Sequence, residues 1–294
     1  MKIGFLGFGE ADSSICRGLH ENGVTGMWGY DLILNVPEKK DKMLAKMAEC
    51  GAAVAAGPEE LAKDADIIIT AIPSQFSVST CESIVNYLEP KTIYLDVSTA
   101  SPLDKQKICS MVESKGARMV DGAMLGALLQ YKHKVPMLLA GPAAQECKDM
   151  MEPLGMDMTV VEGKPGTATS IKFLRSVVAK GLMTLLFECL QAAQYFGVED
   201  TIVDSLLETY GADFEKKINS YVTGTSIHAG RRQHEMENVL DMLKEANLPC
   251  EMTEACVTWM KRIDEANIPA RFPNEEVPKK WKDVLAGWGL NDKQ

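Results

Sequence analysis

The sequence predicts an α/β fold: a doubly wound, mostly parallel Rossmann-type sheet in the N-terminal half, followed by an all-helical C-terminal domain. Three observations predict it. Short apolar runs alternate with helical patterns up to Glu162, a glycine-rich turn follows the first run, and strand-like runs do not recur after Glu162. Alternating β and α segments with near-continuous apolar strands are typical of a parallel sheet that helices cover on both faces.

The elements of the first half follow from these patterns. We expect strands at 2–6, 26–30, 66–70, 92–96, 117–121, 135–140 and 158–162. Helical periodicity predicts helices at 10–21, 37–50, 58–64, 79–88, 103–115 and 143–152.

The pattern changes at the Gly163-Lys164-Pro165-Gly166 turn. A helix is predicted over 167–196, and further helices are predicted at 199–209, 211–222, 228–246, 251–266 and 276–286. We therefore expect two domains, residues 1–163 and residues 164–294, which agrees with a length of 294 residues.

Composition excludes several classes of protein. The 31 basic and 41 acidic side chains give a formal charge of −10, which argues against a nucleic-acid-binding or anionic-membrane surface. No apolar run approaches the ~20 residues of a membrane span, and Met1-Lys2-Ile3-Gly4 leads straight into the first strand rather than into a cleavable leader. Eight scattered cysteines without a CxxC pair predict reduced core thiols and a cytoplasmic location.

The first candidate site is the turn Gly7-Phe8-Gly9-Glu10-Ala11-Asp12, which joins the first strand to a helix. Glycines allow a sharp turn whose backbone closely approaches a pyrophosphate, and the helix N-terminal N–H groups then meet the phosphates. Asp12 stands where the fingerprint has a third glycine, so a carboxylate lies near the expected phosphates. An ordinary strand–helix turn is the alternative interpretation.

Asp31 ends the second strand 22 residues after Gly9. An acidic side chain there bonds the adenosine ribose hydroxyls and repels a 2′-phosphate, which favours NAD over NADP. Lys39 and Lys40 follow nearby and keep NADP open as the alternative. A capping or turn aspartate is the plainer interpretation of Asp31.

Two later segments carry a resemblance to a known family. Asp121-Gly122-Ala123-Met124-Leu125-Gly126 follows a strand, and the turn 163–166 leads into Ser170-Ile171-Lys172-Phe173-Leu174-Arg175-Ser176. With the first glycine turn and Ser98-Thr99 after a late strand, the chain resembles the β-hydroxyacid dehydrogenase superfamily over nearly its whole length. This superfamily includes 3-hydroxyisobutyrate and 6-phosphogluconate dehydrogenases. The stretch 228–236 is similar to a branch whose C-terminal domain is named only by its similarity to phosphogluconate dehydrogenase.

The resemblance implies that Lys172 is the catalytic lysine, and the chemistry agrees, because hydride transfer from an alcohol needs a group that exchanges the hydroxyl proton. A solvent-facing lysine is the alternative. Besides Asp12, the sequence departs from the family pattern in the later segments: Ser176 replaces an asparagine, Ala168 replaces a glycine, and Leu125-Gly126-Ala127 stands where Ser-Gly-Gly is usual. These changes predict a more apolar pocket and leave the substrate's identity open.

The remaining site residues are expectations from the same resemblance. The expected cofactor contacts are Gly7, Phe8, Gly9, Glu10, Ala11, Asp31, Ala71, Ile72, Pro73 and Ser98. The expected substrate contacts are Ser98, Thr99, Met124, Leu125, Gly126, Arg175, Ser176 and Arg231.

Three of these groups have plainer alternatives. Ala71-Ile72-Pro73 is alternatively a simple strand exit. A helix cap is the alternative interpretation of Ser98 and Thr99, and Ser101-Pro102 also fits such a cap. Arg231 and Arg232 are candidates for an anionic substrate or for an ion pair with Glu235 on the next helical turn. We expect no metal site, because the four histidines, including His228 and His234, lack suitably spaced carboxylates.

The sequence thus predicts an NAD-dependent or NADP-dependent oxidoreductase that acts on a small hydroxy acid or the matching carbonyl compound, with its substrate between the domains. The resemblance, together with the apolar helix 167–196, implies a homodimer. An imine reductase is the alternative within the class. A non-catalytic dinucleotide sensor is the alternative from another class, because Asp12, Leu125 and Ser176 all depart from the family pattern.

Overall fold

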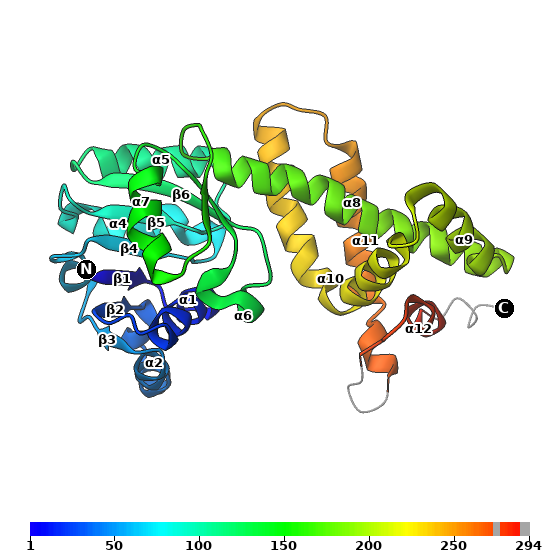
Figure 1. Cartoon of the computed structure of the whole chain (residues 1–294), viewed down its shortest axis with the longest axis horizontal. Helices are drawn as coiled ribbons and strands as arrows, with labels where there is room; N and C mark the ends of the chain where they lie inside the picture. Colours follow the sequence, from blue (N-terminus) through cyan, green and yellow to red (C-terminus); the bar gives the residue numbers. More distant parts are fainter. Residues whose placement is uncertain (273–276, 289–294) are drawn as a thin grey trace. The chain divides into compact units, whose positions relative to one another are not determined.

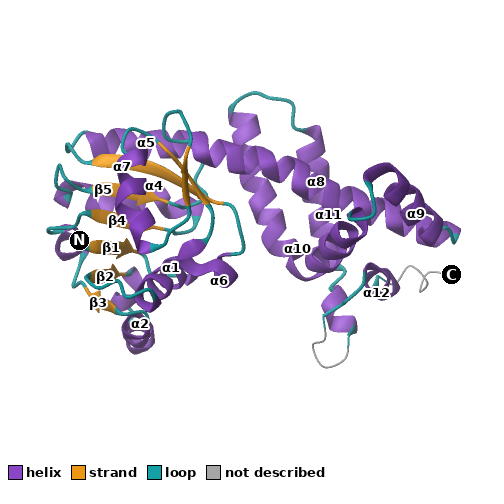
Figure 2. Ribbon diagram, viewed as in Figure 1, coloured by secondary structure: helices purple, strands orange, loops and turns teal. Residues whose placement is uncertain are grey.

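The computed structural model describes residues 1–272 and 277–288, and its first part is a Rossmann-type domain (Figure 1). Among these residues, one eight-stranded sheet has the order β3-β2-β1-β4-β5-β6-β7-β8. The part from β3 to β5 can be followed in Figure 2. The strands are β1 (Ile3–Leu6), β2 (Met27–Tyr30), β3 (Ala52–Val54), β4 (Ile67–Thr70), β5 (Ile93–Asp96), β6 (Arg118–Met124), β7 (Met137–Ala140) and β8 (Met158–Val160). The predicted doubly wound sheet is confirmed.

The strands pair in parallel, except that β6 and β7 are antiparallel. The central strands carry apolar residues on both faces, and successive side chains therefore enter two separate cores. Ile67 and Ile69 of β4 lie in one core, whereas Ile68 lies in the other.

Helices cover both faces of the sheet. The first core packs α1 (Glu10–Glu21), α2 (Pro37–Glu49) and α7 (Ala144–Met151) against the sheet. The second core packs α3 (Pro58–Ala62), α4 (Ser77–Ile84) and α5 (Pro102–Glu113) against the opposite face. All seven predicted strands are present, and the three-residue edge strand β3 is an addition.

The C-terminal part is helical. It contains most of α8 (Thr167–Phe196), followed by α9 (Glu199–Tyr210), α10 (Phe214–Glu245), α11 (Glu251–Glu265) and α12 (Trp281–Gly287). Its cores gather apolar side chains of α8, α10 and α11, including Phe187, Val222 and Ile263. None of the helices that the structure describes is long and apolar enough to cross a bilayer.

Two helix predictions for this part need correction. The expected helices 211–222 and 228–246 are the two halves of α10, which meet at a kink at His228 (φ −116°, ψ 19°). The corrections are that α10 begins only at Phe214 and that residues 223–227 are helical as well. The expected helix 276–286 begins only at Trp281, and residue 276 lies outside the described residues.

The chain divides into two compact units, with the first ending at Lys172 and the second beginning at Phe173. The sequence places this boundary earlier, at 163/164. The difference arises because Gly166 and Thr169 are hydrogen-bonded to Asp121 of the sheet, which ties the first turn of α8 to the first unit. The all-core expectation for the cysteines is wrong at two positions, since Cys189 is exposed and Cys250 is only partly buried.

Candidate active site

The turn between β1 and α1 has the geometry that its glycines predict. Gly7 has a φ of +93°, a conformation that side-chain-bearing residues rarely adopt, and its N–H donates to the Tyr30 carbonyl at 2.8 Å. Gly9 is the N-cap of α1 and is exposed. A Cβ atom on Gly9 would have no neighbour within 4 Å, so the turn leaves open space beside the helix N-terminus.

Lys46 of α2 holds this turn from one side. Its Nζ donates to the carbonyl oxygens of Phe8 and Gly9 at 2.8 and 2.7 Å. In a trans peptide the C=O and the following N–H point in opposite directions. The N–H groups of Gly9 and Glu10, which follow these two carbonyl groups, therefore point away from Lys46.

Asp31 follows β2 and braces the same turn. Its Oδ2 accepts the N–H of Phe8 at 2.7 Å, and its Oδ1 accepts the N–H of Ile33 at 2.8 Å, which caps the short 3₁₀ helix Leu32–Asn35. The capping role that the sequence left open is therefore real. It is compatible with a ligand contact, because each carboxylate oxygen has a second lone pair.

Asp12 occupies the third fingerprint position and is fully buried. Its Oδ2 accepts the Ala71 N–H at 3.2 Å, and its Oδ1 has no hydrogen-bond partner in the described structure. Burial raises the pKa of this carboxyl well above its ordinary value, and the nearby charges of Asp31 and Asp96 raise it further. The Asp12 carboxyl group thus lies in a buried site that favours its protonated form, and it joins the turn to the end of β4.

A pocket of about 550 Å³ opens beside the turn. Six of the expected cofactor residues line it: Gly7, Gly9, Asp31, Ala71, Ile72 and Pro73. The other lining residues were not anticipated, and they are Leu6, Tyr30, Leu32, Ile33, Pro58, Phe76, Ser79, Thr80 and Ser83. Ser79, Thr80 and Ser83 lie on α4, and their spacing of one, three and four residues places them on neighbouring positions of one helix side.

The other expected cofactor residues lie outside this lining. The side chain of Phe8 is fully buried in the first core, whereas Glu10 is exposed and Ala11 is partly buried at the start of α1. Ser98 is buried after β5 and also lies outside the pocket lining. A contact from Phe8 is therefore restricted to its backbone.

The segment after β5 is held by hydrogen bonds between residues that are close in the sequence. The N–H of Ser98 donates to Asp96 Oδ1 at 2.8 Å, and Ser98 Oγ accepts the N–H of Ala100 at 3.4 Å. Ser101 caps α5 by accepting the Asp104 N–H at 3.1 Å. The expected helix cap is therefore Ser101, and Ser98 and Thr99 precede it.

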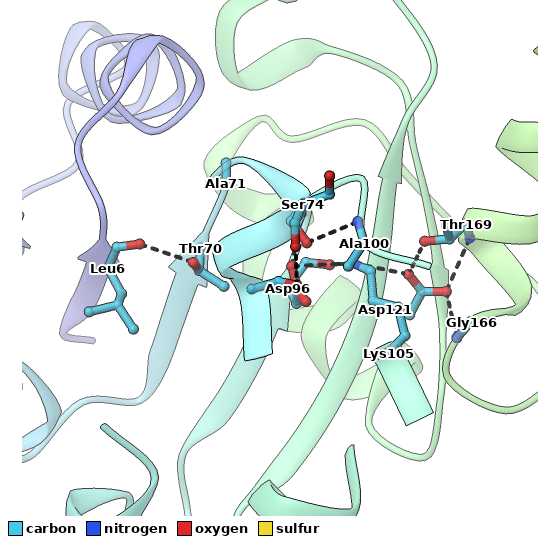
Figure 3. Close-up of polar contacts among 12 residues, drawn as sticks. Leu6, Thr70, Ala71, Ser74, Asp96, Ala100, Lys105, Asp121, Gly166 and Thr169 are labelled. Carbon is cyan, nitrogen blue, oxygen red and sulfur yellow. Dashed lines mark hydrogen bonds and ion pairs between the residues drawn. The ribbon is translucent and has the colours of Figure 1, made fainter. Parts of the chain in front are cut away.

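A buried charge cluster lies beside this segment (Figure 3). Lys105 of α5 is fully buried, and its Nζ lies 3.2 Å from Asp96 Oδ1 and 3.4 Å from Asp121 Oδ1. Sequence reasoning missed Lys105. The signal was present, because Ile108, Cys109 and Val112 follow it at helical spacing on the same buried face.

The expected substrate loop after 121 is largely a strand. β6 continues to Met124 and pairs with β7 in the register Met124↔Met137, because the antiparallel partner extends the ladder. Met124 and Leu125 are partly buried and Gly126 is exposed, immediately after the end of β6. The Leu125 N–H donates to the Pro136 carbonyl at 2.8 Å.

The remaining expected residues lie on α8 and α10. Lys172 is partly buried at the end of the first unit. In the second unit Arg175 is exposed, and Ser176 Oγ accepts a hydrogen bond from Lys180 Nζ at 3.0 Å. Arg231 forms the anticipated ion pair with Glu235 at 3.1 Å, and Lys180 pairs with the same carboxylate at 2.9 Å.

The residues present fit a dinucleotide. A glycine turn with open space at Gly9 supplies unused N–H groups, and an apolar pocket ends at an acidic side chain, Asp31. Within residues 1–272 and 277–288, no group of three or more His, Cys, Asp or Glu side chains is arranged to hold a metal ion.

The family model for the NAD binding domain of 6-phosphogluconate dehydrogenase matches residues 2–163, and a domain of unknown function (DUF1932) matches residues 193–263. An uncharacterised 28.5 kDa protein of Methanothermus fervidus is 29% identical over 90% of this chain and 100% of its own length. The 2-(hydroxymethyl)glutarate dehydrogenase of Eubacterium barkeri is 22% identical over 97% of this chain and 96% of its own length. The solved structure of a conserved hypothetical protein from Sinorhizobium meliloti matches with a TM-score of 0.84 and 28% sequence identity. The match covers 98% of this chain and 95% of that protein.

The first match covers more than half of the chain, and it spans the sheet, the glycine turn and the pocket beside it. The chain therefore belongs to the NAD(P)-binding hydroxyacid dehydrogenases related to 3-hydroxyisobutyrate and 6-phosphogluconate dehydrogenases.

Proposed function

We propose that the protein is an NAD-dependent oxidoreductase that interconverts a small hydroxy acid and the matching carbonyl compound. Lys172 is the proposed general acid and base. The observation that carries the proposal is the pocket beside the glycine turn, which combines open space at Gly9 with the acidic side chain of Asp31. That acidic group supports NAD over NADP, because a 2′-phosphate placed beside it would be repelled.

The chemistry divides between the cofactor and the chain. Bound nicotinamide supplies or accepts the hydride. The chain must exchange the hydroxyl proton, and an amine does so efficiently when its pKa is brought toward the working pH. The position of Lys172, partly buried on α8 and six residues after Gly166, supports this role.

The substrate pocket is proposed from two segments of the first unit. Ser98 and Thr99 supply hydroxyl groups after β5, and Met124, Leu125 and Gly126 follow from the end of β6. Leucine at 125 in place of a hydroxyl residue supports an acid with an apolar substituent. Arg175, Ser176 and Arg231 stay predictions from the sequence for further substrate contacts, and Arg175 is the exposed cation among them that suits a carboxylate.

Two experiments test the proposal. The first is a fluorescence titration of the wild-type protein with NADH and NADPH, in which we expect NADH to bind more tightly. The second is a screen of small hydroxy acids with wild type, Lys172→Ala and, as a matched surface control, Lys107→Ala on the exposed face of α5. We expect Lys172→Ala to lower kcat by about 10²–10⁴-fold and the control to leave it unchanged.

Four outcomes would contradict the proposal or part of it. If neither cofactor binds, the dehydrogenase function is wrong. Turnover of cyclic imines but of no hydroxy acid would indicate an imine reductase, and NADH binding without any turnover would indicate a sensor. Turnover by Lys172→Ala within about tenfold of wild type would remove the acid–base role from Lys172.

A homodimer is part of the proposal. Leu174, Val178, Leu185 and Phe196 of α8 are between 51% and 73% exposed, although all four are apolar. The spacings of four, seven and eleven residues place them along one side of the helix. A second copy of the chain is the proposed cover for this face, and the free cysteines support a reducing compartment such as the cytoplasm.

A further inference from the structure

The ion pair of Lys105 connects two segments that the proposed function uses. Besides its contacts with the two carboxylates, Lys105 Nζ donates to the Asp96 carbonyl oxygen at 2.7 Å. Asp96 and Asp121 are partners in the register of β5 and β6, so the lysine bridges neighbouring strands (Figure 3). All three side chains are fully buried.

Asp121 also holds the first turn of α8. Its Oδ2 accepts the N–H groups of Gly166 and Thr169 at 2.9 and 3.1 Å, and its Oδ1 accepts the Thr169 hydroxyl at 2.7 Å. The carboxylate therefore caps the helix from a neighbouring strand and lies at the positive end of the helix dipole. This position offsets part of the charge of two buried carboxylates that share one ammonium group.

A buried ion pair is weak evidence for net stability, because desolvation of the charges consumes most of the Coulombic gain. Its structural effect is to fix the positions of Asp96, Asp121 and the first turn of α8 relative to one another. Thr169 and Lys172 are three residues apart and share one side of α8. The same cluster holds Ser98 at its other end, through the 2.8 Å bond to Asp96.

We propose that Lys105 and Asp121 are positioning residues that set the place of Lys172 relative to Ser98 and Thr99. The continuous path runs from Ser98 through Asp96, Lys105 and Asp121 to Thr169, entirely within the first unit. This inference rests on the proposed function, since it assigns the cluster to the alignment of the proposed acid–base group.

The sharpest test uses Thr169. Thr169→Val keeps the shape of the buried side chain and removes the hydroxyl that donates to Asp121, whereas Thr169→Ser retains the hydroxyl. We expect Thr169→Val to lower kcat about tenfold with an unchanged Kd for NADH, because misplacement of a catalytic group by as little as 1 Å costs up to about 10²-fold. Thr169→Ser is expected to remain within about twofold of wild type.

A second pair tests the lysine itself. Lys105→Met removes the buried ammonium group, and Lys107→Met makes the same change at an exposed position of the same helix. We expect only Lys105→Met to accelerate amide hydrogen exchange in peptides spanning 97–101 and 166–172. If Lys105→Met does not fold, the Thr169 pair decides the inference.

A third readout does not require turnover. Labelling of Lys172 by an amine reagent, followed by mass spectrometry, measures the accessibility of its amine. We expect the labelling rate to change at least threefold in Thr169→Val and to stay at the wild-type value in Thr169→Ser.

The outcomes separate this inference from the proposed function. A wild-type protein that turns over no substrate would contradict the proposed function, while the labelling rates would still decide the positioning role. Equal labelling and exchange in Thr169→Val, Thr169→Ser and wild type would overturn the inference. An active protein in which Thr169→Val retains the wild-type kcat would also overturn it.

Discussion

The carboxylate of Asp31 accepts the backbone N–H of Phe8 at 2.7 Å, which joins the end of β2 to the glycine turn after β1. The same acidic group lines the pocket beside that turn, where it faces the proposed NAD site. A side chain that was expected either to select the cofactor or to cap a turn therefore also shapes the turn that would hold the phosphates.

The charge of Asp31 is predicted to set the cofactor preference. Asp31→Asn keeps the shape and one acceptor oxygen but removes the negative charge, so the repulsion of a 2′-phosphate falls. We expect the ratio of the NADPH Kd to the NADH Kd to decrease about tenfold, a change of about 1.4 kcal/mol. Fluorescence titrations with both cofactors measure the ratio, and Glu38→Gln on the exposed start of α2 is the control. An unchanged ratio would show that Asp31 acts only as a cap.

Gly9 is predicted to matter for the cofactor and not for the fold. A Cβ atom there meets nothing within 4 Å, so Gly9→Ala should leave the thermal unfolding temperature within about 2 °C of wild type. The added methyl group would occupy the space where the backbone is expected to approach a pyrophosphate. We expect the NADH Kd to rise at least tenfold in a fluorescence titration.

Gly181→Ala is the matched control, because its Cβ atom also has no neighbour within 4 Å and it lies in the second unit. It should bind NADH like wild type. Wild-type affinity in Gly9→Ala would remove the glycine turn from the cofactor site.

The sequence predicted the sheet well, because buried parallel strands leave a local signal. Runs such as Ile67–Thr70 are apolar at nearly every position, and their location follows without tertiary information. β3 was missed because it has only three residues, of which Ala53 and Val54 are exposed at the sheet edge. The kink at His228 coincides with the predicted start of the helix 228–246, whereas residues 223–227, which were predicted to lie between two helices, are helical.

The candidate site was predictable where its residues lie close together in the sequence. Gly7, Gly9 and Asp31 follow from a strand–turn–helix spacing that any Rossmann domain repeats. Lys46 and Lys105 were not predicted, because their partners come from other elements and a lysine is ordinarily a surface residue. Only the register of β5 and β6 brings Asp96 and Asp121 to the same ammonium group.

Asp12 is predicted to lower stability as the pH rises. Burial raises its pKa above the ordinary value of 3.8, so the folded state keeps a proton that the unfolded state loses. Below the unfolded pKa both states are protonated and there is no penalty. Above it, the free energy of unfolding falls by at most about 1.4 kcal/mol per pH unit until the folded pKa is reached.

Asp12→Asn removes this titration while keeping the acceptor for the Ala71 N–H. We expect its unfolding free energy to exceed that of wild type in urea denaturation, by a margin that widens as the pH rises above the unfolded pKa of an aspartic acid. Asp149→Asn makes the same change at an exposed position of α7 and should follow wild type. A constant difference between Asp12→Asn and wild type as the pH rises would mean that Asp12 is ionised in the folded protein.

The exposed apolar side of α8 is predicted to be a subunit interface. Val178 and Leu185 are 72% and 51% exposed and lie seven residues apart, two turns along the same side of the helix. Burial of such side chains against a second copy contributes about 1.5–3 kcal/mol each, and a carboxylate in their place would be desolvated without a partner. We therefore expect Val178→Glu and Leu185→Glu to shift the wild-type dimer to monomer in light scattering coupled to size-exclusion chromatography.

The control for this prediction adds the same charge elsewhere. Ala45→Glu places a carboxylate on the exposed face of α2 in the first unit and should leave the dimer intact. Circular dichroism of each variant checks that the helices are retained, so that loss of the dimer is not loss of the fold. A wild-type protein that is monomeric at micromolar concentration, or a Val178→Glu variant that stays dimeric, would show that this side of α8 faces solvent.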